Sequence, residues 1–361
     1  MGTILAPMKR FLVTVTVVVV TIAAGCGKKK ETAPDNPPTT TGSGSAQMAT
    51  GSGSAVVAET PKGDPKLVER GAYLTSLLGC PFCHMPMGPK GPDFSRPFAG
   101  GMEIPESFGT WRAPNITQHK GSGIGGWTDE QIIAAVREGV RPDGSGMYPI
   151  MPFMNYNRMT DADAKALLAF LRTVAPIDNV VAPNTDLKMP RMAGPKPANE
   201  PDPVDDPLKH GEYLVTMMHC NICHSPMTAR GPDMGRQFAG GMVFEIPMLG
   251  TGKLYGRNIT SDVETGIGKW TVADIEKAVS TMTRPDGTII QGPMQFYLAG
   301  WSKMDKKDLT AIATFVKAIP PLKNAVPAST FKSTMAMSPP PGAGSGDGSA
   351  AGSAAGSGSA K

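Results

Sequence analysis

The chain has few of the residues from which a protein of 361 residues normally builds its cores. Aromatic residues make up 6% of the sequence, whereas 43 glycines and 35 prolines together exceed a fifth of it. The length predicts two modest domains rather than one large one. Two such domains have little apolar bulk to bury, so either much of the chain is linker or a non-protein group fills each core.

A strong charge of either sign is also absent. The formal net charge is +4, and Lys9 and Arg10 contribute half of it from a segment that we expect to be removed. This balance excludes the basic surface of a nucleic-acid-binding protein. The sequence also shows no paired carboxylates and no nucleophile with an adjacent base. The glycine run "GSGIGGW" does not follow a strand pattern, so it is not a dinucleotide-binding motif.

Long apolar runs are missing too. The stretch Phe11–Ile22 follows Lys9 and Arg10, and it is too short to span a bilayer but suits the core of a signal peptide. Small residues then lead to Cys26. We expect residues 1–26 to be a signal peptide that ends at Cys26, which resembles the lipidated cysteine of bacterial lipoproteins. The alternative is an ordinary secretory signal that is cleaved near Ala-Ala-Gly.

Either signal predicts export to the periplasmic or cell-surface side of a bacterial membrane, with a lipid anchor in the first case. The Gly/Ser/Thr/Pro-rich residues 27–62 predict a disordered tether, and residues 329–361 predict a disordered tail of the same character.

The middle of the chain repeats itself. "RGAYLTSLLGCPFCH" is matched by "HGEYLVTMMHCNICH", and Cys80 lies 140 residues before Cys220. Further on, Trp127 of "GIGGW" lies 143 residues before Trp270 of "GIGKW". An internal repeat of this length predicts two tandem domains. We place them at residues 63–182 and 203–328, joined by a Pro-rich linker at 183–202.

The periodicity within each repeat predicts helices joined by long Gly/Pro loops. Apolar residues recur at helical spacing in 66–78 and 208–218 and again in the last segment of each repeat. Thr128 with Gln131 forms a capping box, and Thr271 with Asp274 is its counterpart. No segment shows convincing strand alternation. The predicted fold class is therefore all-α, and Gly71 and Gly211 would let the first and last helices of each repeat cross closely.

Only five cysteines are present, and four of them form the pairs Cys80/Cys83 and Cys220/Cys223, each followed by a histidine. Such clustering does not suit a disulfide framework. A redox dithiol would need a nearby βαβ pattern, and zinc would need two CxxC-type half-sites close in sequence. The third interpretation is covalent haem, with thioethers at the two cysteines and His84 or His224 as the proximal iron ligand. Two equivalent motifs in an exported chain with little core favour two covalently bound haem c groups.

At this point each repeat resembles a class I cytochrome c domain, and the chain is similar to bacterial di-haem cytochromes c, including the cytochrome subunits of periplasmic dehydrogenases. The motifs that carry this resemblance are "CPFCH", "NIT", "GIGGWTDEQI", "GVRPDG" and "YPIMPF", with their counterparts in the second repeat. The resemblance implies helices wrapped around each haem and covers nearly all of 63–328.

The distal iron ligands are predicted from the repeat. The loop before the last helix of the first repeat holds Met147, Met151 and Met154, whereas the matching loop holds Met294 alone. The 143-residue offset pairs Met151 with Met294, and the resemblance agrees, because such domains often carry a distal methionine beside proline in this loop. The alternatives are methionine as a flexible core filler and His119 as the distal ligand.

Other residues are weaker candidates. His219 abuts Cys220 and would lie on the attachment side, and His119 and His210 are expected to be surface or loop residues. The carbonyls of Pro92 and Pro232 are candidates to accept a hydrogen bond from the proximal imidazoles. Contacts to haem propionates or to the methionine loop are an option, beside a structural role, for three pairs: Asn115/Asn258, Trp127/Trp270 and Arg141/Arg284.

Taken together, the sequence predicts an electron carrier with two His/Met-ligated haems. Its redox partners would be a dehydrogenase on one side and an oxidase or another cytochrome on the other. The alternative is a haem enzyme, such as a peroxidase or small-molecule oxidase, which needs an open or labile iron site. A redox or gas sensor is a third class, but no signalling domain is attached.

Overall fold

A computed structural model describes most of the repeat region. The chain divides into two units, residues 1–57 and 58–361, and every described residue lies in the second. The predicted signal segment with Cys26, the tether at 27–62 and all but the first residues of the tail lie outside the described residues. Within the described part, no helix is both long and apolar enough to cross a membrane. The described ranges are 63–88, 91–106, 108–198, 201, 203–228, 231–246 and 250–333.

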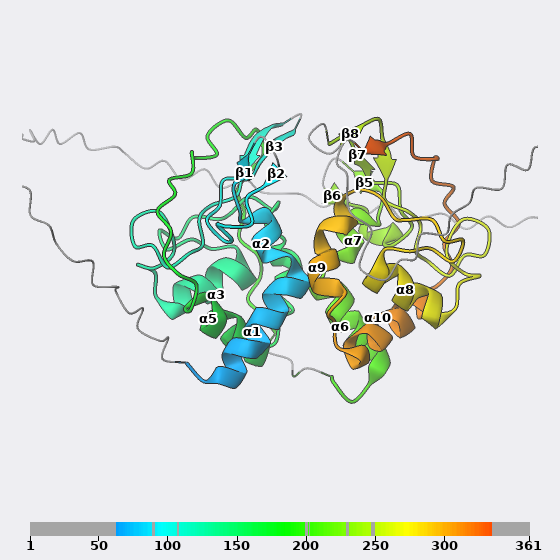
Figure 1. Ribbon diagram of the computed structural model, residues 1–361, viewed down its shortest axis with the longest axis horizontal. Helices are drawn as coiled ribbons and strands as arrows, with labels where there is room; N and C mark the ends of the chain where they lie inside the picture. Colours follow the sequence, from blue (N-terminus) through cyan, green and yellow to red (C-terminus); the bar gives the residue numbers. More distant parts are fainter. Residues whose placement is uncertain are drawn as a thin grey trace, which may run out of the picture. The chain divides into compact units, whose positions relative to one another are not determined.

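The described helices follow the same order in the two repeats (Figure 1). In each repeat a long first helix is followed by a single turn that holds the CxxC motif, then by a middle helix and a last helix. The first repeat contains α1 (Pro65–Leu78), α2 (Cys80–Cys83), α3 (Asp129–Glu138), α4 (Phe153–Tyr156) and α5 (Asp161–Leu171). The second contains α6 (Pro207–Met217), α7 (Cys220–Cys223), α8 (Val272–Thr281), α9 (Leu298–Trp301) and α10 (Lys306–Ala318), with 3₁₀ turns at Met234–Arg236 and Pro293–Tyr297.

The described chain is rich in helices, as the all-α prediction requires, and short strands accompany them. Each strand has two to four residues and forms an antiparallel pair with one neighbour. Strands this short and this rich in Gly and Pro do not show the alternation by which a strand is recognised in a sequence. The pairs are β1–β2 (Met87–Gly88, Gly91–Pro92), β3–β4 (Glu103–Glu106, Gly109–Arg112), β5–β6 (Met227–Thr228, Gly231–Pro232), β7–β9 (Val243–Phe244, Leu254–Tyr255) and β8–β10 (Gly250–Thr251, Lys332–Ser333).

The helix ends are capped as the sequence predicts. Thr128 and Gln131 form a reciprocal capping box at the start of α3, and Thr271 and Asp274 form one at the start of α8. Each box satisfies backbone N–H groups that the first turn of a helix leaves without a partner. Both predictions of a capping box are therefore confirmed.

The first and last helices of each repeat pack against each other (Figure 1), and a glycine lies at each contact. A β-carbon placed on Gly71 of α1 would lie 2.0 Å from the carbonyl oxygen of Ala166 in α5. The same construction on Gly211 of α6 gives 2.1 Å to the oxygen of Ala311 in α10. Only a residue without a side chain allows the two backbones to approach so closely, which confirms the prediction made for both glycines.

The two repeats share one apolar core. Its largest buried cluster contains Leu77 and Leu167 of the first repeat and Leu214, Trp301 and Ile312 of the second. The indole Nε1 of Trp301 donates a hydrogen bond of 2.9 Å to the carbonyl of Leu77. The repeats are thus not independent domains joined only by a linker, because residues of each contribute to the core of the other.

Two buried aspartates add polar contacts across this shared core. Tyr73 of α1 donates its hydroxyl to Asp308 of α10 at 2.7 Å, and Tyr213 of α6 donates to Asp163 of α5 at 2.8 Å. Burial, together with the neighbouring aspartate, raises the pKa of both tyrosines, so each phenol stays a donor. Both aspartates are 5–6% exposed, and a buried charge is tolerated only where such partners surround it.

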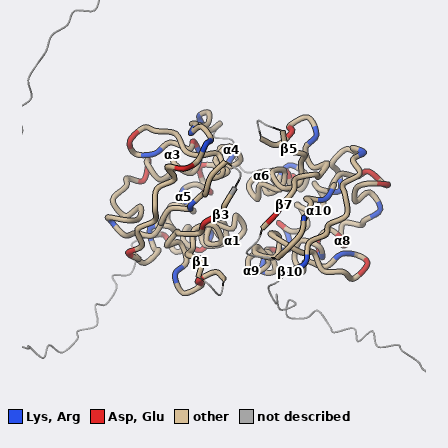
Figure 2. Tube along the Cα trace, turned by 90° about the horizontal axis from the view of Figure 1, so that it is seen from above, with Lys and Arg blue, Asp and Glu red and all other residues tan. Residues whose placement is uncertain are grey.

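Each aspartate also has a cationic or titratable neighbour from its own repeat. Arg70 binds Asp163 through two hydrogen bonds of 2.9 and 3.0 Å, and Nε2 of His210 lies 2.8 Å from an oxygen of Asp308. The expectation that His210 is a surface or loop residue is therefore wrong. The contact of His210 with Asp308 could not be predicted from the sequence, because Asp308 lies 98 residues downstream. Elsewhere on the trace, basic and acidic residues are interspersed (Figure 2).

The glycine crossing makes a direct prediction about stability. Gly71→Ala and Gly211→Ala should each lower the free energy of unfolding by about 1–3 kcal/mol, because the new methyl group meets a backbone carbonyl that cannot move aside easily. Chemical denaturation followed by circular dichroism measures the change. Gly88→Ala is the matched control, since its β-carbon would meet nothing closer than 3.7 Å. Equal unfolding midpoints for Gly71→Ala and Gly88→Ala would contradict the close crossing.

Candidate functional site

Each CxxCH motif is a single helical turn that follows a sharp change of chain direction. The residue just before the turn has a left-handed backbone, with φ of 71° at Gly79 and 45° at His219. The amide of His84 then donates to the carbonyl of Cys80 at 3.0 Å, and the amide of His224 donates to that of Cys220 at the same distance. One turn therefore presents two thiols three residues apart on one face, with the imidazole at its end.

Burial keeps the four thiols in their neutral form. It raises the pKa of Cys80, Cys83 and Cys220 to about 12 and that of Cys223 to about 11. Redox dithiols and zinc ligands act as thiolates, and they occur where positive charge lowers the thiol pKa. The environment of both motifs is the opposite, so the structure favours neither of those two alternatives.

The two motif histidines are held in one orientation by the same type of bond. Nδ1 of His84 lies 2.8 Å from the carbonyl oxygen of Pro114, and Nδ1 of His224 lies 2.8 Å from that of Arg257. A carbonyl can only accept, so Nδ1 must carry the proton, which leaves the lone pair on Nε2 for a metal. Burial also lowers the pKa of both imidazoles, and a neutral ring is the form that binds iron.

These carbonyls are not the ones that the sequence suggested. Pro92 and Pro232 instead pair with Met87 and Met227 in the short strands β1–β2 and β5–β6. The true acceptors occupy equivalent positions, since Pro114 begins "PNIT" and Arg257 begins "RNIT". The sequence could not single them out, because a backbone acceptor does not depend on the side chain that carries it.

The asparagine after each acceptor braces the loop. Oδ1 of Asn115 accepts from the amide and the hydroxyl of Thr117 at 2.9 and 2.8 Å, and its Nδ2 donates to the carbonyl of Ile177 at 2.8 Å. Asn258 makes the same contacts to Thr260 and Leu322. Of the two roles that we considered for these asparagines, the structure thus shows the structural one, which fixes the carbonyl that meets the histidine.

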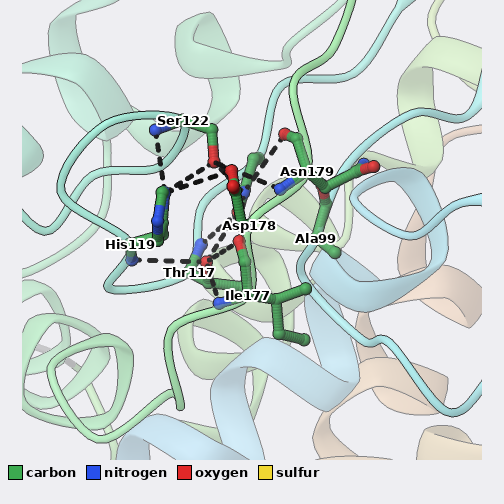
Figure 3. A network of polar contacts seen from close by, with 8 residues as sticks. Ala99, Thr117, His119, Ser122, Ile177, Asp178 and Asn179 are labelled. Carbon is green, nitrogen blue, oxygen red and sulfur yellow. Dashed lines mark hydrogen bonds and ion pairs between the residues drawn. The ribbon is translucent and has the colours of Figure 1, made fainter. Parts of the chain in front are cut away.

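Figure 3 shows how far this brace extends in the first repeat. Asn179 donates to the carbonyl of Ala99 at 2.9 Å, and the amide of Ile177 donates to the hydroxyl of Thr117 at 3.1 Å. His119 belongs to the same network, because its Nδ1 accepts from the amide of Ser122 at 3.0 Å. The prediction that His119 is a loop residue is confirmed.

The second repeat contains a partly open cavity of about 390 Å³. The cavity wall contains both cysteines of the motif, His224 and the predicted distal ligand Met294. Apolar side chains supply most of the remaining wall, among them Leu254, Ile267, Trp270, Ile275, Val279 and Ile290. An apolar slot with two thiols at its edge and an imidazole and a thioether in its wall fits a haem held by two thioether bonds.

Two arginines also line this cavity, Arg257 and Arg284. The guanidinium of Arg284 donates to the carbonyl of Ile289 at 3.1 Å, and burial lowers its pKa. These cations suit the carboxylate groups that a haem carries on one edge. The repeat pattern pointed to Arg284 but missed Arg257, because the equivalent residue of the first repeat is Pro114.

In the first repeat, the two candidate iron ligands, His84 and Met151, come from different segments of the chain. His84 is buried beside Pro114, whereas Met151 is half-buried against the main core in the turn that precedes α4. The pairing of His84 with Met151, like that of His224 with Met294, stays a prediction at this point.

Comparison with known proteins identifies the first repeat. Residues 68–175 match the family model described as Cytochrome c. They form a cytochrome c domain. The chain is also 29% identical to a di-haem cytochrome c-type protein of Cereibacter sphaeroides, over 73% of this chain and 91% of that protein. The cytochrome c domain and this relative imply that the chain carries covalently bound haem c.

Two further relatives are named as parts of dehydrogenases. The cytochrome c subunit of a quinone-type alcohol dehydrogenase from Gluconacetobacter polyoxogenes is 33% identical over 74% of this chain. The cytochrome subunit of a fructose dehydrogenase from Gluconobacter japonicus is 31% identical over 70% of it. The chain spans 58% and 52% of the length of these two proteins. The resemblance predicted from the sequence is thus confirmed.

The environment of His219 predicts how stability depends on pH. Burial lowers its pKa from 6.5 to about 4, so the unfolded chain takes up this proton before the folded chain does. The stabilising contribution is complete above pH 6.5 and is lost as the pH falls toward 4. His219→Asn keeps a residue that tolerates the left-handed backbone but does not titrate. As the pH falls from 6.5 to 4, the unfolding free energy of this variant should therefore decrease by roughly 1–3 kcal/mol less than that of the unsubstituted chain.

Denaturant unfolding at a series of fixed pH values measures this difference. His119→Asn serves as the control, since His119 is partly exposed in a loop. If His219→Asn and the unsubstituted chain show the same slope of stability against pH, then His219 is not buried in the folded protein.

Proposed function

We propose that this chain is an electron-transfer protein that carries two covalently bound haem c groups, one in each repeat. The observation that carries the proposal is the duplicated motif geometry. In both repeats two thiols lie on one helical turn, and the adjacent histidine donates Nδ1–H to a backbone carbonyl at 2.8 Å. The cytochrome c domain at residues 68–175 accounts for one of these sites, and the second has the same construction.

In this proposal the residues of each repeat have separate roles. Cys80 and Cys83 hold the first haem through thioether bonds, and Cys220 and Cys223 hold the second. His84 with Met151 would bind the iron of the first haem, and His224 with Met294 that of the second. The bound haem supplies the one-electron chemistry. The chain fixes the imidazoles, surrounds the haem with apolar residues and supplies a thioether ligand, which favours a high reduction potential.

The proposed electron donor is a dehydrogenase, and the proposed acceptor is an oxidase or another cytochrome. Support for the donor comes from the relatives, which are named as cytochrome subunits of an alcohol, a fructose and a gluconate dehydrogenase. We propose that this chain serves such an enzyme rather than catalysing a reaction of its own.

The proposed location is the outer side of a bacterial membrane. Residues 1–26 would be the signal peptide, Cys26 the lipid-bearing residue and 27–62 the tether. The domains would span 63–182 and 203–328, with 183–202 as the linker and 329–361 as the tail. Support for export is the basic pair Lys9 and Arg10 ahead of a short apolar run.

The ligand assignment predicts a specific spectrum. The ferric protein should show the near-infrared sulfur-to-iron charge-transfer band of methionine ligation, and carbon monoxide should not change the ferrous spectrum. Met151→Ala and Met294→Ala should each remove about half of that band, since each removes one of two equivalent ligands. Met154→Ala, in the adjacent helix α4 and 50% exposed, should leave it unchanged. A high-spin ferric signal or rapid carbon monoxide binding in the unsubstituted protein would instead indicate an open site and a haem enzyme.

The anchor can be tested separately. Cys26→Ala should move the protein from the membrane fraction to the soluble fraction, because it removes the site of acylation. Fractionation followed by detection of covalent haem measures the change. Membrane association that persists in Cys26→Ala would overturn the lipid anchor and leave the redox function untouched.

A further inference from the structure

The loop that carries each predicted methionine ligand packs against the cysteine motif of the other repeat. Phe296 and Tyr297 follow Met294 and contact the first motif, whereas Asn155 and Tyr156 follow Met151 and contact the second. The two exchanges use different residues, so this feature is not visible in the repeat pattern.

The contact with the first motif is aromatic. The ring of Phe82, between the two cysteines of "CPFC", stacks on Phe296 with ring centroids 4.1 Å apart and planes inclined by 19°. Tyr297 lies against Gly79, the residue before Cys80, so closely that a β-carbon on Gly79 would come within 2.2 Å of its ring. The glycine is therefore required both by its left-handed backbone and by the tyrosine beside it.

Tyr297 touches the second site as well. It lines the cavity that contains Cys220, Cys223 and His224, and its ring lies 6.0 Å from that of His219 in an edge-on arrangement. It also stacks on Trp301, at 4.9 Å between ring centroids. One side chain thus forms part of the wall of the second site and supports the backbone of the first.

The contact with the second motif is mainly polar. Nδ2 of Asn155 donates to the side-chain oxygen of Asn221, between the cysteines of "CNIC", and to the carbonyl of Thr216, both at 2.9 Å. Tyr156 is 3% exposed and lies edge-on to His219 at 6.3 Å. The methionine loop of the first repeat is therefore fixed to the attachment turn of the second by hydrogen bonds and a ring contact.

We propose that these reciprocal contacts couple the two haem sites, with Tyr297 as the residue that positions one site against the other. The potential of a haem depends on its axial ligand, its burial and the charges near it. A displacement of one methionine loop would therefore be transmitted to the attachment turn of the other site, because the two segments are in direct contact. The proposal rests on the two-haem function proposed above.

Two substitutions test the coupling. Tyr297→Leu removes the shared ring, and Met154→Leu is the control, at a position in α4 that is 50% exposed. Redox titration followed by proton NMR resolves the two haems through their methionine methyl signals, assigned with Met151→Ala and Met294→Ala. In the unsubstituted chain, reduction of one haem should change the redox equilibrium constant of the other by about fivefold or more.

Tyr297→Leu should bring this factor close to one and should shift the potential of the first haem, although the substitution lies in the second repeat. Met154→Leu and Tyr297→Phe should preserve the coupling, and Tyr297→Phe also shows that the site tolerates substitution. Should Tyr297→Leu fail to fold, Asn155→Ala tests the reciprocal contact, and we expect it to shift the potential of the second haem.

The possible failures can be told apart. A protein mass that corresponds to one haem would overturn the two-haem function, and the coupling with it. Two haems that titrate independently in the unsubstituted chain would overturn the coupling alone. Coupling that survives both Tyr297→Leu and Asn155→Ala would show that these contacts do not carry it.

Discussion

The imidazole of each CxxCH motif is oriented by a hydrogen bond from Nδ1 to the carbonyl of Pro114 or Arg257. In both repeats the residue that follows this carbonyl is itself held by hydrogen bonds. The asparagine that follows it uses both ends of its amide, so the backbone cannot rotate without breaking buried hydrogen bonds. Breaking such bonds costs about 1–3 kcal/mol for each polar group left unsatisfied. The chain alone therefore fixes the orientation of the imidazole, without a metal bound to its Nε2.

Packing in this chain follows from its low aromatic content. Helices that lack bulky side chains must approach closely to bury apolar area, and Gly71 and Gly211 permit this at both crossings. The remaining core is shared between the repeats, since Leu77 and Trp301 belong to one cluster. A large apolar group in the cavity beside His224 would supply the bulk that the second repeat does not obtain from its own side chains.

The sequence predicts well those features that depend on the spacing of a few neighbouring residues. The CxxCH motifs, the capping boxes at Thr128 and Thr271 and the two crossing glycines all follow from a few residues or from comparing the repeats. The sequence points instead to Pro92 and Pro232 as the carbonyl partners, which is wrong. The true acceptors, Pro114 and Arg257, cannot be recognised from the sequence, because a backbone carbonyl does not depend on the side chain that follows it. The buried role of His210 and the position of Tyr297 were not visible either. Each depends on a contact with residues about a hundred or more positions away.

The two tyrosine–aspartate contacts across the shared core are reciprocal, like contacts related by a two-fold axis. Tyr73 binds Asp308, and its counterpart Tyr213 binds Asp163, with each aspartate in the third position of its helix. A residue that meets the partner of its own counterpart is the mark of an isologous dimer interface. A domain half this size that formed a symmetric dimer through these contacts would have the same arrangement. The two halves differ beside each pair, with arginine at position 70 and histidine at position 210.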